Sequence, residues 1–144
     1  MSGIYKLGDE AITTAVTNLV ITDGVSVSGV AQSFIDGLDF AAAVTLQANF
    51  TWGSAGTTVK VDVETSLDQG STWIPIYRFA FTTASAEKVI NLSGLTPVTS
   101  VYTPTTLSDD AGKDGILGDR LRCRITSTGT YAGNTSVAVR AAVR

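Results

Sequence analysis

The sequence predicts an all-β protein that folds as one antiparallel β-sandwich of jelly-roll type. The chain has 144 residues, the length of a single domain, and 44% of them are hydrophobic whereas only 16% are charged. Short runs rich in Val, Thr and aromatic residues alternate apolar and polar side chains, which is the pattern of strands with one buried face. Clusters of Gly, Asp, Ser and Pro separate these runs and no long helical pattern is convincing, so we expect about eight short strands in two sheets.

The first ten residues, 1–10, are expected to form a flexible, extended N-terminal arm, and residues 11–144 the sandwich domain. Residues 1–10 lack the apolar core of a secretory signal, and no run in the chain approaches the length of a membrane span. We therefore expect no membrane partner.

Residues 11–22 leave two interpretations open. Ile12, Val16 and Leu19 fit one face of a helix. The Thr and Val content instead favours a strand that ends at Asp23 and the glycine after it. The residues alone do not choose between the two.

The clearest strands lie in the middle of the chain. In Val44–Trp52 every second side chain is apolar, and the alternation continues through a hairpin between residues 57 and 81, where Pro75 indicates an edge strand or a bulge. The other expected strands are 25–28, 34–40, 89–92, 120–126 and 136–144. The side chains expected to face the interior are Val44, Leu46, Ala48, Phe50, Trp52, Val59, Val61, Val63, Trp73, Tyr77, Phe79, Phe81, Leu121, Cys123, Ile125, Val137, Val139, Ala141 and Val143.

The turn of this hairpin reads S-x-D-x-G-x-T-W, from Ser66 to Trp73. Asp68 is placed to accept hydrogen bonds from turn N–H groups, and Gly70 to take a positive φ. Ser66 and Thr72 are expected to bond locally, and Trp73 to fold its ring into the core while its indole N–H finds a carbonyl. The turn resembles the Asp-box of sialidases and other β-proteins, which stiffens a hairpin and implies a structural role.

A long polar segment, Ser93–Gly118, exceeds the usual length of a connection in a compact domain, so we expect it to bind something or to lie on a partner. It contains Asp109 and Asp110, with Asp119 close behind. Calcium is one interpretation, but the alternating D-x-D-x-D-G spacing is missing and Lys113 opposes a cation. We favour a solvated or interface loop, with Asp109 and Asp110 as candidate interface residues.

The residues give little support to catalysis. The chain has no histidine, no phosphate-binding glycine motif and a single cysteine, Cys123, which the alternation points inward as an inert thiol. Asp36 and Asp39 would serve a glycosidase only if the fold placed them across a cleft. We therefore expect no catalytic residue, no metal and no cofactor, and a protein that is not an enzyme.

Charge is spread unevenly along the chain. Residues 1–59 hold five acidic residues against one lysine, whereas residues 113–144 hold six basic residues against two acidic ones. The basic part has Tyr131 as its only aromatic residue, so nucleic acid is not the expected partner. The outward arginines of the last two strands are either a solvated sheet face opposite Asp62 and Glu64 or a contact surface for an acidic neighbour. These candidate interface residues are Arg120, Arg122, Arg124, Arg140 and Arg144.

Three stretches resemble small all-β virion proteins encoded by tailed bacteriophages and prophages. They are VTLQANFTWGSAGTTVKVDVETSLDQGSTWIPI, FAFTTASAEKVINLSGLTPVTSVYTPT and DGILGDRLRCRITSTGTYAGNTSVAVRAAVR, and they cover about two-thirds of the chain. The last stretch is the most distinctive.

The resemblance implies a structural protein of the virion, made in the host bacterial cytoplasm. Its expected role is a minor capsid or head decoration protein that binds the major capsid protein or a neighbouring virion protein and stabilises the capsid lattice. A neck, collar or tail-associated subunit is the alternative station. We also expect a homo-oligomer, with a trimer as one arrangement.

A carbohydrate-binding module is the alternative from another class. The aromatic residues Trp52, Trp73, Tyr77, Tyr102 and Tyr131 suggest it, because sugars stack on exposed, coplanar rings. The inward position expected for Trp52 and Trp73 weakens this alternative.

Overall fold

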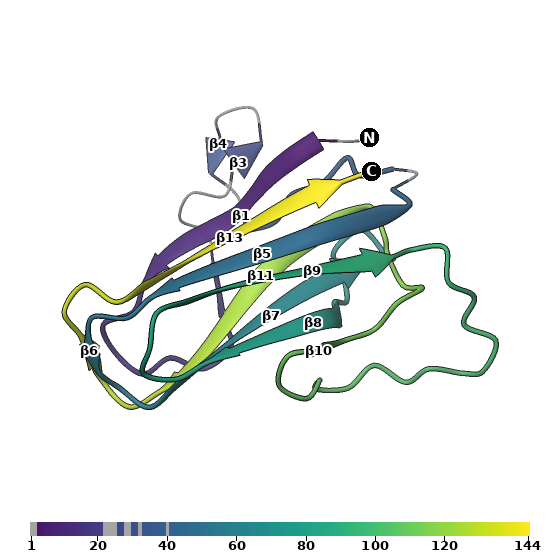
Figure 1. Ribbon diagram of the computed structural model, residues 1–144. Coiled ribbons are helices and arrows are strands. Elements are labelled where there is room, and N and C mark those ends of the chain that lie inside the picture. The colour runs from purple at the N-terminus through teal and green to yellow at the C-terminus, as the bar shows by residue number, and fades with distance from the viewer. Residues whose placement is uncertain (1–2, 22–25, 28–29, 32, 40) are drawn as a thin grey trace.

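A computed structural model describes residues 3–21, 26–27, 30–31, 33–39 and 41–144. In this part of the chain every regular element is a strand, and the long strands form two sheets that pack face to face (Figure 1), which confirms the predicted all-β sandwich. None of the described residues forms a helix long and apolar enough to cross a membrane. The strands are β1 (Gly3–Ala11), β2 (Leu19–Val20), β3 (Ser26–Val27), β4 (Val30–Ala31), β5 (Ala43–Thr51), β6 (Ser54–Ala55), β7 (Thr58–Ser66), β8 (Ile74–Phe81), β9 (Ala86–Ser93), β10 (Ala111–Gly112), β11 (Arg120–Thr128), β12 (Tyr131–Ala132) and β13 (Ser136–Val143).

Eight of the strands pair in the order of one nested hairpin. β1 pairs with β13, β2 with β11, β5 with β9 and β7 with β8, and all four pairs are antiparallel. The first sheet has the order β1-β13-β5-β9, and the second has the order β10-β8-β7-β11-β2. Rolling up such a nested hairpin gives a jelly roll, to which the short β10 adds one edge.

Alternate side chains of the long strands seal a dry interior between the two sheets. The interior positions expected in β5, β7, β11 and β13 are all buried. Phe50 stacks on Phe81 with ring centroids 5.0 Å apart, and the edge of Tyr131 meets Phe50 at 6.0 Å. The Tyr131 hydroxyl donates a 2.6 Å hydrogen bond to the carbonyl of Thr82, so this buried polar atom is satisfied.

Residues 3–10 do not form the flexible arm expected from the sequence, because they belong to β1. This strand pairs with β13 at the edge of the first sheet, with a bulge between Lys6 and Gly8, and Leu7 adds to the core. The prediction was wrong because the bulge interrupts the apolar alternation and the partner strand lies at the far end of the sequence. Residues 1–2 lie outside the described part of the chain.

Two segments before β5 also differ from their predictions. Residues 12–21 contain no helix and no strand other than β2, and residues 33–39 contain no strand. Ile35 instead makes an isolated bridge to Leu121, with N–H···O distances of 2.8 and 3.0 Å. Scattered backbone bonds to the second sheet and its flank thus replace a full ladder. The parts of these predictions, and of the expected strand 25–28, that fall on residues 22–25, 28 and 40 lie outside the described residues.

A β-bulge in the β7–β8 hairpin changes the direction of Trp73. Val63 pairs with Tyr77 but Glu64 pairs with Pro75, so the register shifts by one residue between them. Pro75 therefore marks a bulge, one of the two alternatives that the sequence allowed. The shift carries Trp73 to the outer side of the second sheet, where it is half-buried, so its expected place in the core was wrong.

The segment between β9 and β11 contains a long loop that projects away from the sheets. The short strand β10 pairs with the edge strand β8, and the N–H of Lys113 donates to the carbonyl of Ile76 at 2.9 Å. Residues 94–108 form no strand, and they swing out beyond the ends of the sheets as the green loop in Figure 1. We call residues 94–108 the uncharged loop, because no charged residue occurs in them.

Candidate docking surfaces

The turn from Ser66 to Trp73 has the local bonds that its residues predict. The Asp68 carboxylate accepts from the Thr72 N–H at 2.8 Å and from the Thr72 hydroxyl at 2.6 Å. The Ser66 hydroxyl accepts from the Gly70 N–H at 2.8 Å, and Gly70 has a φ of 91°. The indole N–H of Trp73 donates to the Gly70 carbonyl at 3.1 Å. These bonds close a turn within the chain, as expected of a structural element.

The hydrogen bonds of this turn also set the acidity of Asp68. The Thr72 hydroxyl and the Thr72 N–H stabilise the carboxylate, and together they lower the pKa of Asp68 below its usual value. The ionised form is therefore the form that holds the turn together.

A ladder of ion pairs covers the outer face of the second sheet. Arg78 of β8 holds Asp62 of β7 with two hydrogen bonds of 2.7 Å. Arg122 of β11 donates to Glu64 at 2.7 Å, and Arg124 lies 3.2 Å from Glu64 and 3.8 Å from Asp62. Both carboxylates are buried beneath the arginines that neutralise them. The bond to Asp62 raises the pKa of Arg78.

Aromatic rings lie beside this ladder. The guanidinium of Arg122 sits 4.4 Å from the centroid of the Trp73 ring, and that of Arg120 sits 5.0 Å from Phe34. The Trp73 and Phe34 rings are 6.0 Å apart. One side of Trp73 is thus occupied by an arginine of the same chain.

The predicted arginine row is divided between the two sheets. Arg120, Arg122 and Arg124 lie on the second sheet, whereas Arg140 belongs to β13 and Arg144 follows it, in the first sheet. The single row was wrong because β11 and β13, although consecutive long strands, belong to different sheets. Arg140 instead pairs with Asp9 of β1 at 2.8 Å. The interpretation in which Asp62 and Glu64 face the arginines is the one that the geometry supports for the second sheet.

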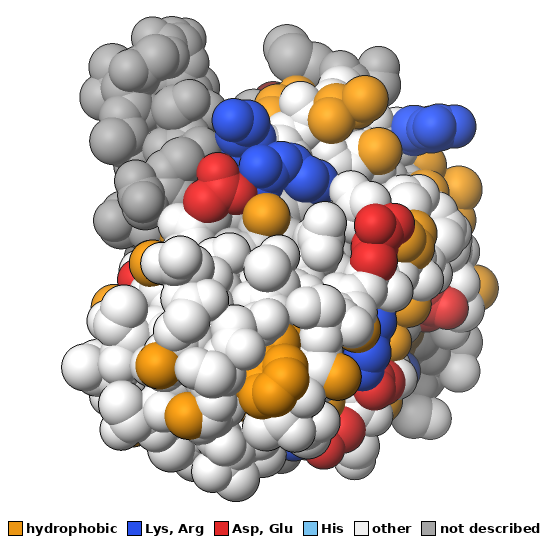
Figure 2. Space-filling view, turned by 60° about the vertical axis from the view of Figure 1, so that its left-hand side comes forward, with side chains coloured by type: hydrophobic (Ala, Val, Ile, Leu, Met, Phe, Trp, Pro, Cys, Tyr) orange, Lys and Arg blue, Asp and Glu red, His pale blue; other side chains and the backbone are white. Residues whose placement is uncertain are grey.

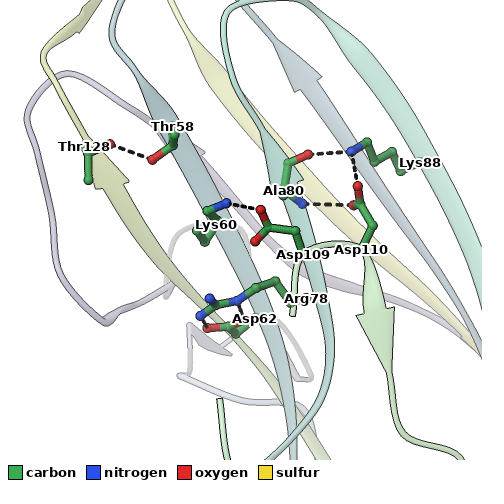
Figure 3. Close-up of polar contacts among 9 residues, drawn as sticks. All are labelled: Thr58, Lys60, Asp62, Arg78, Ala80, Lys88, Asp109, Asp110 and Thr128. Atoms are coloured by element: carbon green, nitrogen blue, oxygen red, sulfur yellow. Dashed lines mark hydrogen bonds and ion pairs between the residues drawn. The ribbon is translucent and has the colours of Figure 1, made fainter. Parts of the chain in front are cut away.

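Asp109 and Asp110 are engaged within the chain, as Figure 3 shows. Asp109 accepts from Lys60 of β7 at 2.6 Å, and Asp110 accepts from Lys88 of β9 at 2.8 Å and from the N–H of Ala80 at 3.1 Å. Lys88 also donates to the Ala80 carbonyl, so it ties β9 of one sheet to β8 of the other. These two aspartates therefore fasten the end of the long segment to the sandwich.

Burial acts to raise the pKa of Asp110, but the hydrogen bonds from Lys88 and Ala80 outweigh it and lower the pKa below its usual value. Among the residues that the structure places, no three of His, Cys, Asp and Glu come together as a metal site would require. Asp119 lies 3.9 Å from Arg120, and Asp114 accepts from the N–H of Ser93 at 2.9 Å.

The sequence did not single out Lys60, Arg78, Lys88 and Phe34. Lys60 and Arg78 occupy polar positions of alternating strands, which marks them as outward but not as partners of particular acids. Their partners could not be predicted, because neither the bulged register of the β7–β8 hairpin nor the pairing of β7 with β11 follows from the sequence.

Two surfaces expose large apolar side chains away from the second sheet. The uncharged loop exposes Leu95 and Val101, and the outer face of the first sheet exposes Ile4 and Val89. The end of the sandwich that carries β6 is covered mainly by uncharged polar groups (Figure 2). The apolar exposures thus lie apart from the ion-pair ladder of the second sheet.

Comparison of the chain with protein-family models, with curated proteins and with solved structures found no match.

Proposed function

We propose that this chain is a structural virion protein of a tailed bacteriophage, acting as a minor capsid or head decoration protein. One observation carries the proposal: an ordered, uncharged loop with exposed Leu95 and Val101 projects from a sandwich whose second sheet has its carboxylates paired internally (Figure 1). Docking such a loop removes apolar side chains from water and leaves no charge unpaired. The projecting loop suits the protein to binding a neighbour.

The jelly-roll topology supports the same role by analogy. Two-sheet jelly rolls occur in viral capsid domains and also in lectins, so the fold by itself does not select a function. The resemblance of residues 114–144 to small phage virion proteins favours the capsid. The protein would then be made in the host cytoplasm, assemble as a homo-oligomer and remain in the particle without catalysing a reaction.

The mechanism is the repetition of a small contact. A single extended loop buries less area than a standard interface, so each contact is weak. Many such contacts on one lattice add their binding through multivalency. A shell crossed by such contacts resists expansion better than the major capsid protein alone.

The direct test is the composition of purified particles. We expect mass spectrometry to find this chain in a copy number comparable with that of the major capsid protein, and electron microscopy to place it on the head. A handful of copies at the neck or tail would instead support the alternative station. Absence from the particles would overturn the virion assignment.

Binding can be tested with particles from a phage that lacks the gene. Purified chain added to such particles is expected to co-sediment with them and to raise the temperature at which the heads open. Leu67→Asp is the control variant, because it changes an exposed apolar side chain in the β7–β8 turn, outside the uncharged loop. Equal co-sedimentation with the heads of an unrelated phage would contradict specific binding to this lattice.

The outward position of Trp73 favours a second candidate, a carbohydrate-binding module. Trp73 and Phe34 form an aromatic pair on the outer face of the second sheet, where rings could meet a sugar. Arg122 already covers one side of Trp73, which leaves a smaller platform. Binding to a glycan array, with quenching of tryptophan fluorescence that Trp73→Phe removes, would establish this candidate.

A further inference from the structure

The uncharged loop has a periodicity of three. Every third position from 95 to 107 is apolar, with Pro97 and Tyr102 as further apolar residues between them, and none of the intervening residues is charged. A polyproline II helix has three residues per turn, so in that conformation side chains at this spacing share one side of the segment. The residues at this spacing are Leu95, Val98, Val101, Pro104 and Leu107.

The base of the loop is fixed to the sandwich, whereas Leu95 and Val101 are left exposed. The Gly115 N–H donates to the Ser93 carbonyl at 2.8 Å, and Lys113 lies 5.0 Å from the centroid of the Tyr102 ring. Beyond these fastenings, Leu95 is 75% exposed and Val101 is 98% exposed. The loop is therefore a projection (Figure 1) on which Leu95 and Val101 face the solvent.

The outer face of the first sheet contains a groove of about 250 Å³, which we call the outer groove. Ile4 of β1 and Val89 of β9 stand on the two edge strands of the sheet, 84% and 55% exposed. Three strand spacings, about 14 Å, separate these strands, and the small side chains of Ala142 and Thr45 lie between them. The groove thus has apolar rims, a shallow floor and room for one extended segment.

The charges at the groove are compatible with an uncharged occupant. Arg140 is the charged residue among those that line it, and its guanidinium is paired with Asp9 at 2.8 Å. An uncharged segment laid over this floor would leave that pair intact. It would also bury Ile4 and Val89, two exposed apolar side chains that nothing else in the described chain covers.

We propose that the uncharged loop of one copy docks in the outer groove of a second copy of this chain. Both halves of the contact are carried by the same sequence, and the fixed base of the loop directs its tip away from the sandwich that bears it. The contact is heterologous, with different surfaces on the two partners, so it closes a ring or extends a chain. This contact would build the homo-oligomer of the proposed function, and the inference rests on that part of the proposed function.

Self-association is tested by analytical ultracentrifugation of the purified full chain, from micromolar to millimolar concentration. Val101→Asp changes the loop and Ile4→Asp changes the groove, while Leu67→Asp is the control at another exposed apolar position. We expect each of the first two variants to weaken association at least about tenfold, because a carboxylate would lose its hydration on docking. The control should associate like the wild type.

A mixing experiment identifies the two halves of the contact. Val101→Asp chains keep an intact groove and Ile4→Asp chains keep an intact loop, so a mixture can form one loop-to-groove contact per pair. We therefore expect each variant alone to be monomeric and the equimolar mixture to yield dimers that do not grow further. Circular dichroism and thermal melts check folding, and Val89→Asp replaces Ile4→Asp if the latter is unfolded.

Three results would overturn the proposal: a monomeric wild type at millimolar concentration, variants that associate like the wild type, or a mixture that stays monomeric. These results are distinct from failure of the virion assignment, which is tested by the composition of purified particles. A chain present in particles but monomeric in solution would refute the loop-to-groove contact alone.

Discussion

Arg122 and Glu64 form the closest contact between charged groups of β11 and β7, with a 2.7 Å hydrogen bond from the arginine Nε to a carboxylate that is only 2% exposed. The same guanidinium lies over the ring of Trp73. One arginine thus neutralises a buried acid and fastens the aromatic residue that ends the Asp-box-like turn. The arginine is held by its own chain, which makes it a structural element of the second sheet.

Arg122→Ala is expected to lower the free energy of unfolding by roughly 2–4 kcal/mol, because it leaves Glu64 buried with only Arg124 beside it. Urea unfolding followed by tryptophan fluorescence measures the change. Arg122→Lys is the matched control, since it retains the charge and loses the planar geometry. A double variant that combines Arg122→Ala with Glu64→Gln should lose less free energy of unfolding than the two single variants lose in sum. Additive losses would show that the pair is not coupled.

Asp68→Ala is expected to destabilise the β7–β8 hairpin, because the Thr72 N–H and hydroxyl lose their acceptor. The pKa of Asp68 is lowered in the folded state, so its contribution is complete above the usual aspartate pKa of about 3.9 and is lost as the pH falls through the lowered value. Thermal melts between neutral pH and pH 2 should therefore show wild type and variant converging in acid. A difference that stays constant with pH would contradict this account.

Cys123 should resist thiol reagents until the protein unfolds. Its side chain is fully buried, and burial raises the pKa of the thiol, with Asp62 and Glu64 adding to the effect. We expect labelling in native buffer to be slower than in urea by on the order of a thousandfold or more. The control combines Cys123→Ala with Thr128→Cys, at the exposed end of the same strand, and should react at once. Fast labelling of native wild type would contradict the packing of β11.

Asp110→Asn is expected to loosen the long segment between β9 and β11 without unfolding the sandwich. Lys88 would lose its charged partner, and the single amide oxygen would replace two carboxylate oxygens that accept from Lys88 and from the Ala80 N–H, but such partly exposed contacts change global stability by only about 1 kcal/mol or less. Hydrogen exchange followed by mass spectrometry should show faster exchange in residues 94–112. Asp109→Asn, which removes a single contact with Lys60, should have a smaller effect.

The pH dependence of this fastening follows from the acidity of Asp110. Its pKa is lowered in the folded state, so the fastening is complete at neutral pH and is released as the pH falls through the lowered pKa. Exchange in residues 94–112, corrected for its intrinsic pH dependence, should rise in acid before the sandwich melts. A loop that loosens only with global unfolding would show that Lys88 and Asp110 do not hold it.

Much of the local structure could be predicted from single residues and their spacing. The period of two in Val44–Trp52 places alternate side chains on a dry face, whatever strand lies beside it. The turn from Ser66 to Trp73 follows from residues that bond to one another across a few positions. Trp52 packs against the core as expected, with its indole N–H bonded to the Ala55 carbonyl at 2.9 Å.

The ion pairs and the candidate docking surfaces were less predictable, because the residues that form them are distant in the sequence. Asp9 and Arg140 are 131 residues apart, and nothing near either residue indicates the other. A bulge of one residue was enough to carry Trp73 from the core side to the outer side of the second sheet. The outer groove likewise needs β1 and β9 on opposite edges of the first sheet, which only the pairing order supplies.

The sequence by itself determined that this chain forms strands, which of their side chains are buried, and how the β7–β8 turn is closed, since these depend on alternation and on bonds between near neighbours. Only the tertiary structure decided which strands pair beyond the β7–β8 hairpin, which arginines neutralise Asp62 and Glu64, and where apolar side chains remain exposed. A side chain's alternation fixes the face of a strand on which it lies but carries no information about the neighbouring strand. That choice is made by the packing of all the strands at once.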